Sequence, residues 1–256
     1  MLRTQNGVKY FSMGDGPEAV ICHPSLGLGR FLFYRLLPVL SRHYRVVTYD
    51  PRGVGENAAL EPDLEAWVGD VGDLLNEVDR PAHLLGVSLG TWVMARAAVR
   101  WPDKIRRLVL IGATPGFQDG ETAVEQRRQE LAAIPMDEFS RRYADATLTP
   151  FADPEVKEQL VADMRTMDAD NYLQAMAAIY LASNRRVFQE LTHDTLFVVG
   201  NHDTRTSPRM ADEAAHLTSR GRVHVVPDAG HLALLDQPQR VQELIEAFLA
   251  AGRVEA

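Results

Sequence analysis

The chain has 256 residues, 46% of them hydrophobic and 24% charged, so it can build one large domain with a substantial core. With 27 Lys and Arg against 35 Asp and Glu, its formal net charge is −8, which argues against nucleic acid or an anionic membrane as a partner. The single cysteine, Cys22, excludes an internal disulfide framework and a cysteine-based zinc site. With no signal-peptide core and no membrane-length apolar run, we expect a soluble cytoplasmic protein.

Short apolar runs alternate with segments of helical periodicity. Residues 7–12 are expected to form an antiparallel edge strand, and further strands are expected at residues 19–22, 45–49, 82–85, 107–111, 195–199 and 223–226. Helical spacing of apolar residues runs from Trp67 to Val78 and from Val241 to Leu249. Consecutive apolar positions are typical of parallel strands covered on both faces, so the pattern predicts an α/β fold with a mostly parallel, doubly wound sheet. His83 and His224 lie inside predicted strands and are expected to be packed.

One segment, from about residue 117 to residue 190, contains no convincing strand. It is helical in pattern and separates two late strands that we expect to lie side by side. Its length is roughly half that of an ordinary domain, which favours a cap over a separate interaction domain. We therefore expect a core of residues 1–116 and 191–256, with a helical cap at 117–190 inserted into it.

The pentapeptide that runs from Gly86 through Ser88 to Gly90 follows a predicted strand and precedes an Ala-rich helical stretch. A serine between two glycines at this spacing suits a tight turn from strand to helix, which presents the hydroxyl at the carboxyl end of a sheet. Such a hydroxyl can attack a carbonyl if a base removes its proton. We therefore predict that Ser88 is the nucleophile.

The base and its orienting acid are expected in the loops after two later strands. Asp203 follows the strand at 195–199 and His231 follows the strand at 223–226, which gives the order serine, acid, histidine. Asp228 is a rival acid, but it is so close to His231 in sequence that a special turn would be needed. His202 is a rival base that the chain order disfavours.

The developing negative charge in acyl transfer needs hydrogen-bond donors. We predict the backbone N–H of Leu89, directly after the nucleophile, and that of Ser25 in the loop after the strand at 19–22. Pro24 has no N–H and cannot donate.

Together these motifs resemble those of α/β-hydrolase-fold proteins over nearly the whole chain. The matching landmarks occur in the family's order: His23 to Ser25, a loop at residues 50–55, the Ser88 turn, Gly200 to Asp203, and Ala229 to His231. The family has glycine where this chain has Pro24, which leaves the second oxyanion donor open by one residue. The resemblance implies the α/β-hydrolase fold and a Ser-His-Asp triad that works without a cofactor or metal.

A narrower resemblance links residues 148–156 and 171–179 to the cap of 3-oxoadipate enol-lactonase-like members. Those lactonases follow the second segment with an Arg-Asp pair, whereas this chain has Tyr180 and Leu181, which favours a less acidic substrate. From the cap composition and the first loop we predict four substrate-binding residues: Leu26, Tyr143, Met176 and Tyr180. Arg185 and Arg186 are expected on a solvated helix face.

The sequence thus predicts a cofactor-independent serine hydrolase that cleaves an ester or lactone of a small, fairly apolar molecule. Alternatives on the same scaffold are a carbon–carbon bond hydrolase for diketone-type substrates, a cofactor-free peroxidase or an acyltransferase. A small-molecule receptor with slow hydrolysis is a further alternative. The sequence says nothing about oligomeric state.

Overall fold

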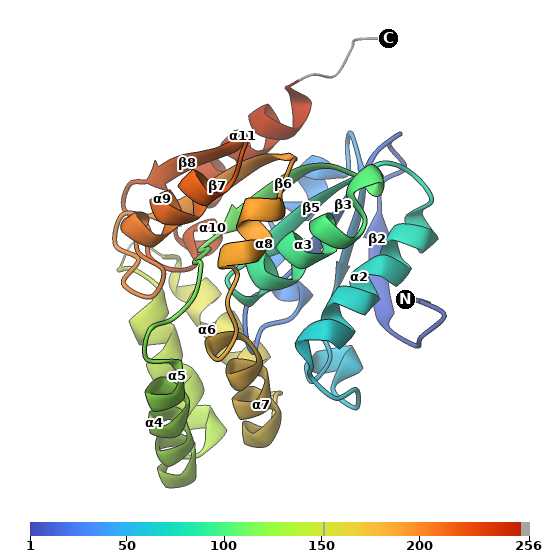
Figure 1. The fold of residues 1–256 in the computed structure, drawn as a ribbon. Coiled ribbons are helices and arrows are strands. Elements are labelled where there is room, and N and C mark those ends of the chain that lie inside the picture. Colours follow the sequence, from blue (N-terminus) through green and yellow to red (C-terminus); the bar gives the residue numbers. More distant parts are fainter. Residues whose placement is uncertain (151, 252–256) are drawn as a thin grey trace.

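A computed structural model describes residues 1–150 and 152–251 (Figure 1). Its single sheet has the strand order β1-β2-β4-β3-β5-β6-β7-β8. The first two strands pair antiparallel, β2 is also antiparallel to β4, and all other neighbours are parallel. The strands are β1 (Leu2–Arg3), β2 (Lys9–Met13), β3 (Ala19–His23), β4 (Arg45–Tyr49), β5 (Ala82–Val87), β6 (Ile105–Ile111), β7 (Asp194–Gly200) and β8 (Gly221–Val226).

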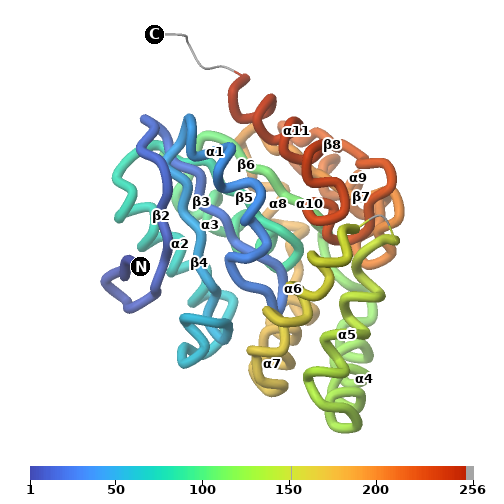
Figure 2. Tube along the Cα trace, turned by 180° about the vertical axis from the view of Figure 1, so that it is seen from behind, coloured from blue at the N-terminus to red at the C-terminus, as the bar shows by residue number. Residues whose placement is uncertain are grey.

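Helices cover both faces of this sheet. One face carries α2, α3, α8 and α9 (Figure 1), and the opposite face carries α1 and α11 (Figure 2). The helices are α1 (Leu37–Leu40), α2 (Leu64–Val78), α3 (Leu89–Arg100), α4 (Gly120–Ala133), α5 (Met136–Thr147), α6 (Pro154–Met164), α7 (Ala169–Tyr180), α8 (Arg185–Glu190), α9 (Pro208–Leu217), α10 (Ala233–Asp236) and α11 (Pro238–Ala250), with short 3₁₀ turns η1 (Arg30–Phe33), η2 (Gly55–Asn57) and η3 (Pro102–Lys104).

The predicted elements are present, with small shifts at their ends. Strands β3, β5 and β7 have buried side chains on both faces, because each lies inside the sheet under two helical layers. The expected packing of His83 is confirmed, since it is 3% exposed. The same expectation for His224 is wrong: β8 is the last strand of the sheet, and His224 on it is exposed.

The helical segment between β6 and β7 is confirmed, and these two strands pair directly, with Val109 opposite Leu196. Helices α4 to α7 gather beyond one end of the sheet (Figures 1 and 2). The chain enters and leaves this segment at one place, where Gly116 and Ser183 form a β-bridge and the Asn184 N–H donates to the Pro115 carbonyl. The division into core and cap stays a prediction. Phe151, in the segment that resembles lactonases, lies outside the described residues.

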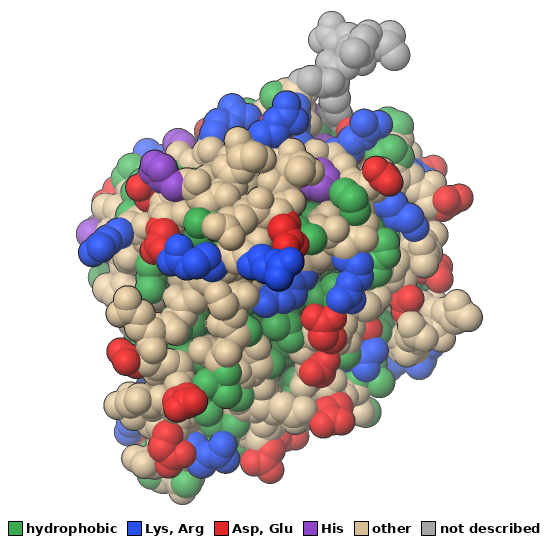
Figure 3. Space-filling view, viewed as in Figure 1, with side chains coloured by type: hydrophobic (Ala, Val, Ile, Leu, Met, Phe, Trp, Pro, Cys, Tyr) green, Lys and Arg blue, Asp and Glu red, His purple; other side chains and the backbone are tan. Residues whose placement is uncertain are grey.

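The face of the molecule that carries α8 has charged side chains of both signs (Figure 3). Arg185 and Arg186 are both exposed on α8, where Arg185 pairs with Glu213 and Arg186 pairs with Glu190. Their exposure agrees with the expected solvated helix face. Among the described residues, no helix is long and apolar enough to cross a membrane.

A half-buried carboxylate ties α6 to the loop after β3. Asp163 on α6 accepts the Gly29 N–H at 2.7 Å, and Asp50 accepts the neighbouring Arg30 N–H at 2.8 Å. Burial is the largest cause that raises the pKa of Asp163, from its usual 3.8 to about 6; the Gly29 N–H opposes this shift and the charge of Asp50 adds to it. The folded protein therefore holds this proton more tightly than the unfolded chain does.

This difference predicts a pH-dependent effect of Asp163→Asn, which keeps an oxygen acceptor for Gly29 but has no charge. Ionisation of Asp163 removes stability as the pH rises between 3.8 and about 6. The variant lacks that loss, so its free energy of unfolding relative to the wild type should rise by roughly 2 kcal/mol between pH 4 and pH 8. Urea unfolding across this range measures it. A difference that does not change with pH would contradict the assignment.

Candidate active site

Ser88 lies in a strained turn between β5 and α3. Its backbone has φ 52° and ψ −109°, a conformation that residues other than glycine rarely adopt. The Ser88 N–H donates to the Ile111 carbonyl of β6 at 2.8 Å, which anchors the turn to the sheet. Strain of this kind persists only where the surroundings hold the backbone in place.

The two glycines of the pentapeptide permit the close approaches that hold the turn. A Cβ on Gly86 would lie 2.4 Å from the Gly90 carbonyl oxygen. A Cβ on Gly90 would lie 2.2 Å from the carbonyl oxygen of His23, the last residue of β3. Both contacts are with backbone, which cannot swing away as a side chain can. The turn is therefore compatible only with residues that have no side chain at these two positions.

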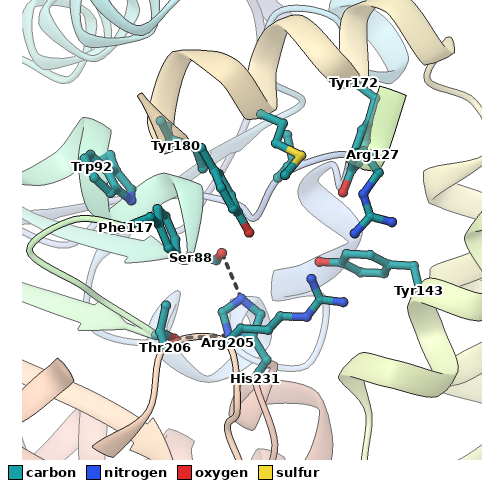
Figure 4. Close-up of a pocket in the computed structure, with 14 residues that line it drawn as sticks. Ser88, Trp92, Phe117, Arg127, Tyr143, Tyr172, Tyr180, Arg205, Thr206 and His231 are labelled. Atoms are coloured by element: carbon teal, nitrogen blue, oxygen red, sulfur yellow. Dashed lines mark hydrogen bonds between the residues drawn. The ribbon is translucent and has the colours of Figure 1, made fainter. Parts of the chain in front are cut away.

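His231 connects Ser88 to Asp203. The Oγ of Ser88 lies 2.9 Å from Nε2 of His231 (Figure 4), and Nδ1 of His231 lies 2.9 Å from Oδ2 of Asp203. The imidazole is 5% exposed and the side chain of Asp203 is fully buried. These three residues, which the sequence analysis selected from three separate loops, form one continuous hydrogen-bonded chain.

The carboxylate of Asp203 accepts hydrogen bonds from other groups besides the imidazole of His231. Its Oδ1 accepts the N–H groups of Arg205 and Thr206 at 2.8 and 2.9 Å, and its Oδ2 accepts the Thr206 hydroxyl at 2.8 Å. Burial pushes the pKa of Asp203 up, but the bonds from His231 and Thr206 outweigh it, so the pKa lies below its usual value. The carboxylate is therefore ionised and suited to orient the imidazole. The sequence analysis missed Thr206, since a threonine three residues after an acid is an ordinary loop residue.

The loop that carries His231 is held from two sides. The Gly230 N–H donates to Oδ2 of Asp236 at 2.7 Å, and the His202 N–H donates to the Ala229 carbonyl at 2.9 Å. The rival acid Asp228 is exposed at a positive φ of 55°, and the rival base His202 is also exposed. Neither rival forms a hydrogen bond with Ser88 or His231 among the described residues.

The loop after β3 meets the N-terminus of α3 at the Pro24 carbonyl. That oxygen accepts the Gly90 N–H at 3.1 Å and lies 3.0 Å from Nδ1 of His23. Burial is the largest cause that lowers the pKa of His23, to about 4, so its ring is neutral at pH 7. A carbonyl can only accept, so Nδ1 of His23 carries the proton. One carbonyl thus fixes the loop against the turn that carries Ser88.

This arrangement leaves backbone donors free beside Ser88. Within the described residues, the N–H groups of Leu89, Ser25 and Leu26 have no hydrogen-bond acceptor. Leu26 lines the cavity that adjoins Ser88, whereas Ser25, which is 1% exposed, is not among the lining residues. The expected donors Leu89 and Ser25 thus have free N–H groups, and Leu26 is a third group of the same kind.

A small, partly enclosed cavity adjoins Ser88 and His231. The structure places all four predicted substrate-binding residues, Leu26, Tyr143, Met176 and Tyr180, on its wall, although their role in binding stays a prediction. The cavity volume is about 30 Å³, so a substrate of several carbon atoms requires the surrounding side chains or helices to move. The rings of Phe117 and Tyr180 stack with centres 4.0 Å apart and also line an adjoining surface groove, so they form the wall between the two.

A sequence model of the alpha/beta hydrolase family matches residues 19–244 of the chain. The chain belongs to the alpha/beta hydrolase family. This assignment confirms the fold and the family that the motifs predicted, and it accounts for the order of strands, turn and loops around Ser88.

Two curated relatives of this hydrolase match nearly the whole chain. It is 28% identical over 256 residues to a pimeloyl-[acyl-carrier protein] methyl ester esterase from Methylococcus capsulatus, covering 93% of this chain and 97% of the relative. It is 27% identical over 263 residues to a 2-hydroxy-6-oxo-2,4-heptadienoate hydrolase from Pseudomonas putida, covering 93% and 91%.

Among solved structures, the enol-lactonase from Burkholderia xenovorans LB400 is similar with a TM-score of 0.88 and 22% identity, over 96% of this chain and 98% of that one. At that identity the likeness shows a shared fold.

The hydrolase also places two arginines on the cavity wall, which the sequence analysis did not select. Arg127 comes from α4 and Arg205 from the loop after β7, and in Figure 4 both guanidinium groups point toward the same part of the cavity. The apolar composition of the cap suggested a less polar wall. Arg205 stands two residues after Asp203, and that proximity is the one sequence signal that could have indicated it.

The contact of Gly90 with the His23 carbonyl predicts that Gly90→Ala distorts the turn of this hydrolase. Since the added Cβ would lie 2.2 Å from that oxygen, the variant should be destabilised by about 1 to 3 kcal/mol and lose most of its activity. Gly69→Ala in α2 is the matched control, because nothing lies within 4 Å of its Cβ. The control should be neutral or up to about 1 kcal/mol more stable. Thermal unfolding and ester turnover of both variants decide the outcome.

Proposed function

We propose that this protein is a cofactor-independent serine hydrolase that cleaves an ester or a lactone through an acyl-enzyme. The observation that carries the proposal is the pair of 2.9 Å contacts from Ser88 to His231 and from His231 to Asp203. The strained backbone of Ser88 and the free N–H groups beside it support the same chemistry.

In the proposed mechanism, Oγ of Ser88 attacks the substrate carbonyl while Nε2 of His231 takes its proton. Asp203 accepts the Nδ1–H bond, holds the imidazole in the required orientation and stabilises its charged form. His231 then protonates the leaving alkoxide, which departs as an alcohol, or stays attached when the substrate is a lactone. In the second half, His231 deprotonates a water molecule that attacks the acyl-enzyme, which releases the acid and restores Ser88.

The negative charge on the carbonyl oxygen is stabilised by backbone N–H groups. Leu89 supplies one at the N-terminus of α3, where the helix dipole adds to the effect. The second comes from the loop after β3, where Ser25 is the predicted donor and the placement of Leu26 on the cavity wall supports Leu26 as the alternative. Donors fixed in place by the fold need no reorganisation as the charge develops.

Carbon–carbon bond hydrolysis is the second candidate function. The relative from Pseudomonas putida is named as a 2-hydroxy-6-oxo-2,4-heptadienoate hydrolase, and its similarity extends over most of both chains. The two functions differ in the bond that breaks, so measuring turnover of both classes of substrate distinguishes them. Turnover of diketone-type compounds without turnover of esters or lactones would favour the second candidate.

Ser88→Ala tests the nucleophile. A panel of aryl esters and lactones of graded acyl length should show turnover with the wild-type protein, and the variant should lose roughly a thousandfold or more while its unfolding transition is unchanged. A folded variant that retains near-full activity would contradict the proposed mechanism.

Asp203→Asn tests the acid. An amide at this position no longer holds the imidazole in the required tautomer, so kcat should fall by about 10⁴-fold. The matched control is Asp228→Asn, because Asp228 is exposed in the loop just before His231. The control should stay within about threefold of the wild type, which is the range of a surface change without a catalytic contact. Equal losses in both variants would contradict the choice of Asp203.

A further inference from the structure

The charge around the cavity is opposite in sign to the charge of the chain. The formal net charge is −8, yet the residues on the cavity wall include Arg127 and Arg205 and, within the described part of the chain, neither Asp nor Glu. A cation directed into a small, partly enclosed cavity is unfavourable unless an anion or another strong acceptor faces it. The wall therefore carries two cationic side chains, of which Arg127 is paired with Glu130 outside the cavity lining and Arg205 has no acidic partner among the described residues.

Arg205 is held in place, but it has no carboxylate bound to its guanidinium. Its backbone N–H donates to Oδ1 of Asp203 at 2.8 Å, which fixes the residue beside the proposed triad. Its guanidinium carbon lies 4.8 Å from the centre of the Tyr143 ring, a cation–π contact, and the guanidinium also donates a hydrogen bond to the Tyr180 hydroxyl. The remaining N–H donors of the group are available to a ligand. Among the described residues, no Asp or Glu side chain pairs with it, because the carboxylate of Asp203 is occupied by His231, Thr206 and backbone.

Arg127 supplies a second set of donors on the same wall. Its Nη1 pairs with Glu130, and its guanidinium carbon lies 4.8 Å from the centre of the Phe139 ring. Its Nε is buried and has no hydrogen-bond partner within the described residues. A buried donor without an acceptor is a defect in a protein interior unless a ligand completes it.

We infer that the substrate carries a carboxylate, which Arg205 binds with Arg127 as a second donor. This inference rests on the proposed function and names the substrate class of that same cavity: an ester or lactone that also bears an acid group. The planar guanidinium presents paired N–H donors that match the two oxygens of a carboxylate. The carboxylate of the substrate would accept hydrogen bonds from N–H groups of Arg205 and Arg127 while the reacting carbonyl lies at Ser88.

Matched substrates test the charge without changing the shape. One series has the carboxylate on the acyl side: monomethyl succinate, glutarate and adipate, each against the methyl ester of the corresponding monoamide. The other has it on the alcohol side: 2-acetoxyacetate, 3-acetoxypropanoate and 4-acetoxybutanoate, each against its amide. For at least one pair, kcat/KM of the acid should exceed that of the amide about tenfold or more, as expected for charge-assisted hydrogen bonds.

Three variants assign that preference to Arg205. In Arg205→Met the ratio of acid to amide kcat/KM should fall to within about threefold of one, whereas Arg205→Lys should keep part of the preference because it keeps the charge. Arg185→Met is the matched control, since Arg185 is exposed on α8 and pairs with Glu213; its ratio should equal that of the wild type. A wild type without preference in any pair overturns the inference, and so does an Arg205→Met variant with an unchanged ratio.

A binding measurement separates this inference from the proposed function. If the wild type hydrolyses none of these esters, the proposed hydrolysis fails. Carboxylate binding is then tested separately, by calorimetric titration of Ser88→Ala with glutarate and with glutaramide. Glutarate should bind at least tenfold more tightly, and the added change Arg205→Met should abolish the difference. Equal affinity of the two ligands would overturn the carboxylate site without bearing on Ser88.

Discussion

The strained turn at Ser88 is the constraint on which the rest of this site depends. A serine at a φ of 52° is unfavourable by itself, so its surroundings must supply the stabilisation. The Ile111 carbonyl holds its N–H, and the glycines on either side let backbone approach to distances that no Cβ allows. Because the turn is anchored to β6 and to the loop after β3, the hydroxyl has one direction in which to point.

Close backbone contacts at the carboxyl ends of the strands also position the candidate oxyanion donors and His231. The Pro24 carbonyl accepts the Gly90 N–H and thereby fixes the loop that supplies candidate oxyanion donors. Asp236 holds the Gly230 N–H and so fixes the loop of His231. Each proposed catalytic group is therefore oriented by hydrogen bonds to backbone, which do not depend on a bound substrate. Preorganisation of this kind is what electrostatic catalysis requires.

The helices inserted between β6 and β7 supply much of the cavity wall. Helices α4, α5 and α7 contribute Arg127, Tyr143 and Tyr180, while the loop that also holds Asp203 contributes Arg205. Both sides of the cavity thus carry a cationic side chain, and one of the two is next to the proposed triad. Relatives that are named for different reactions are consistent with one fold that supports several chemistries.

The sequence by itself determined the alternation of strands and helices, the turn at Ser88 and the order of Ser88, Asp203 and His231, because these depend on local periodicity and on short motifs with strict backbone demands. It was wrong about His224, since periodicity does not reveal which strand ends a sheet. Only the tertiary structure decided that Thr206 supports Asp203 and that Arg127 and Arg205 face the cavity. These contacts join residues from separate loops and helices, and side-chain packing, not local pattern, sets their directions.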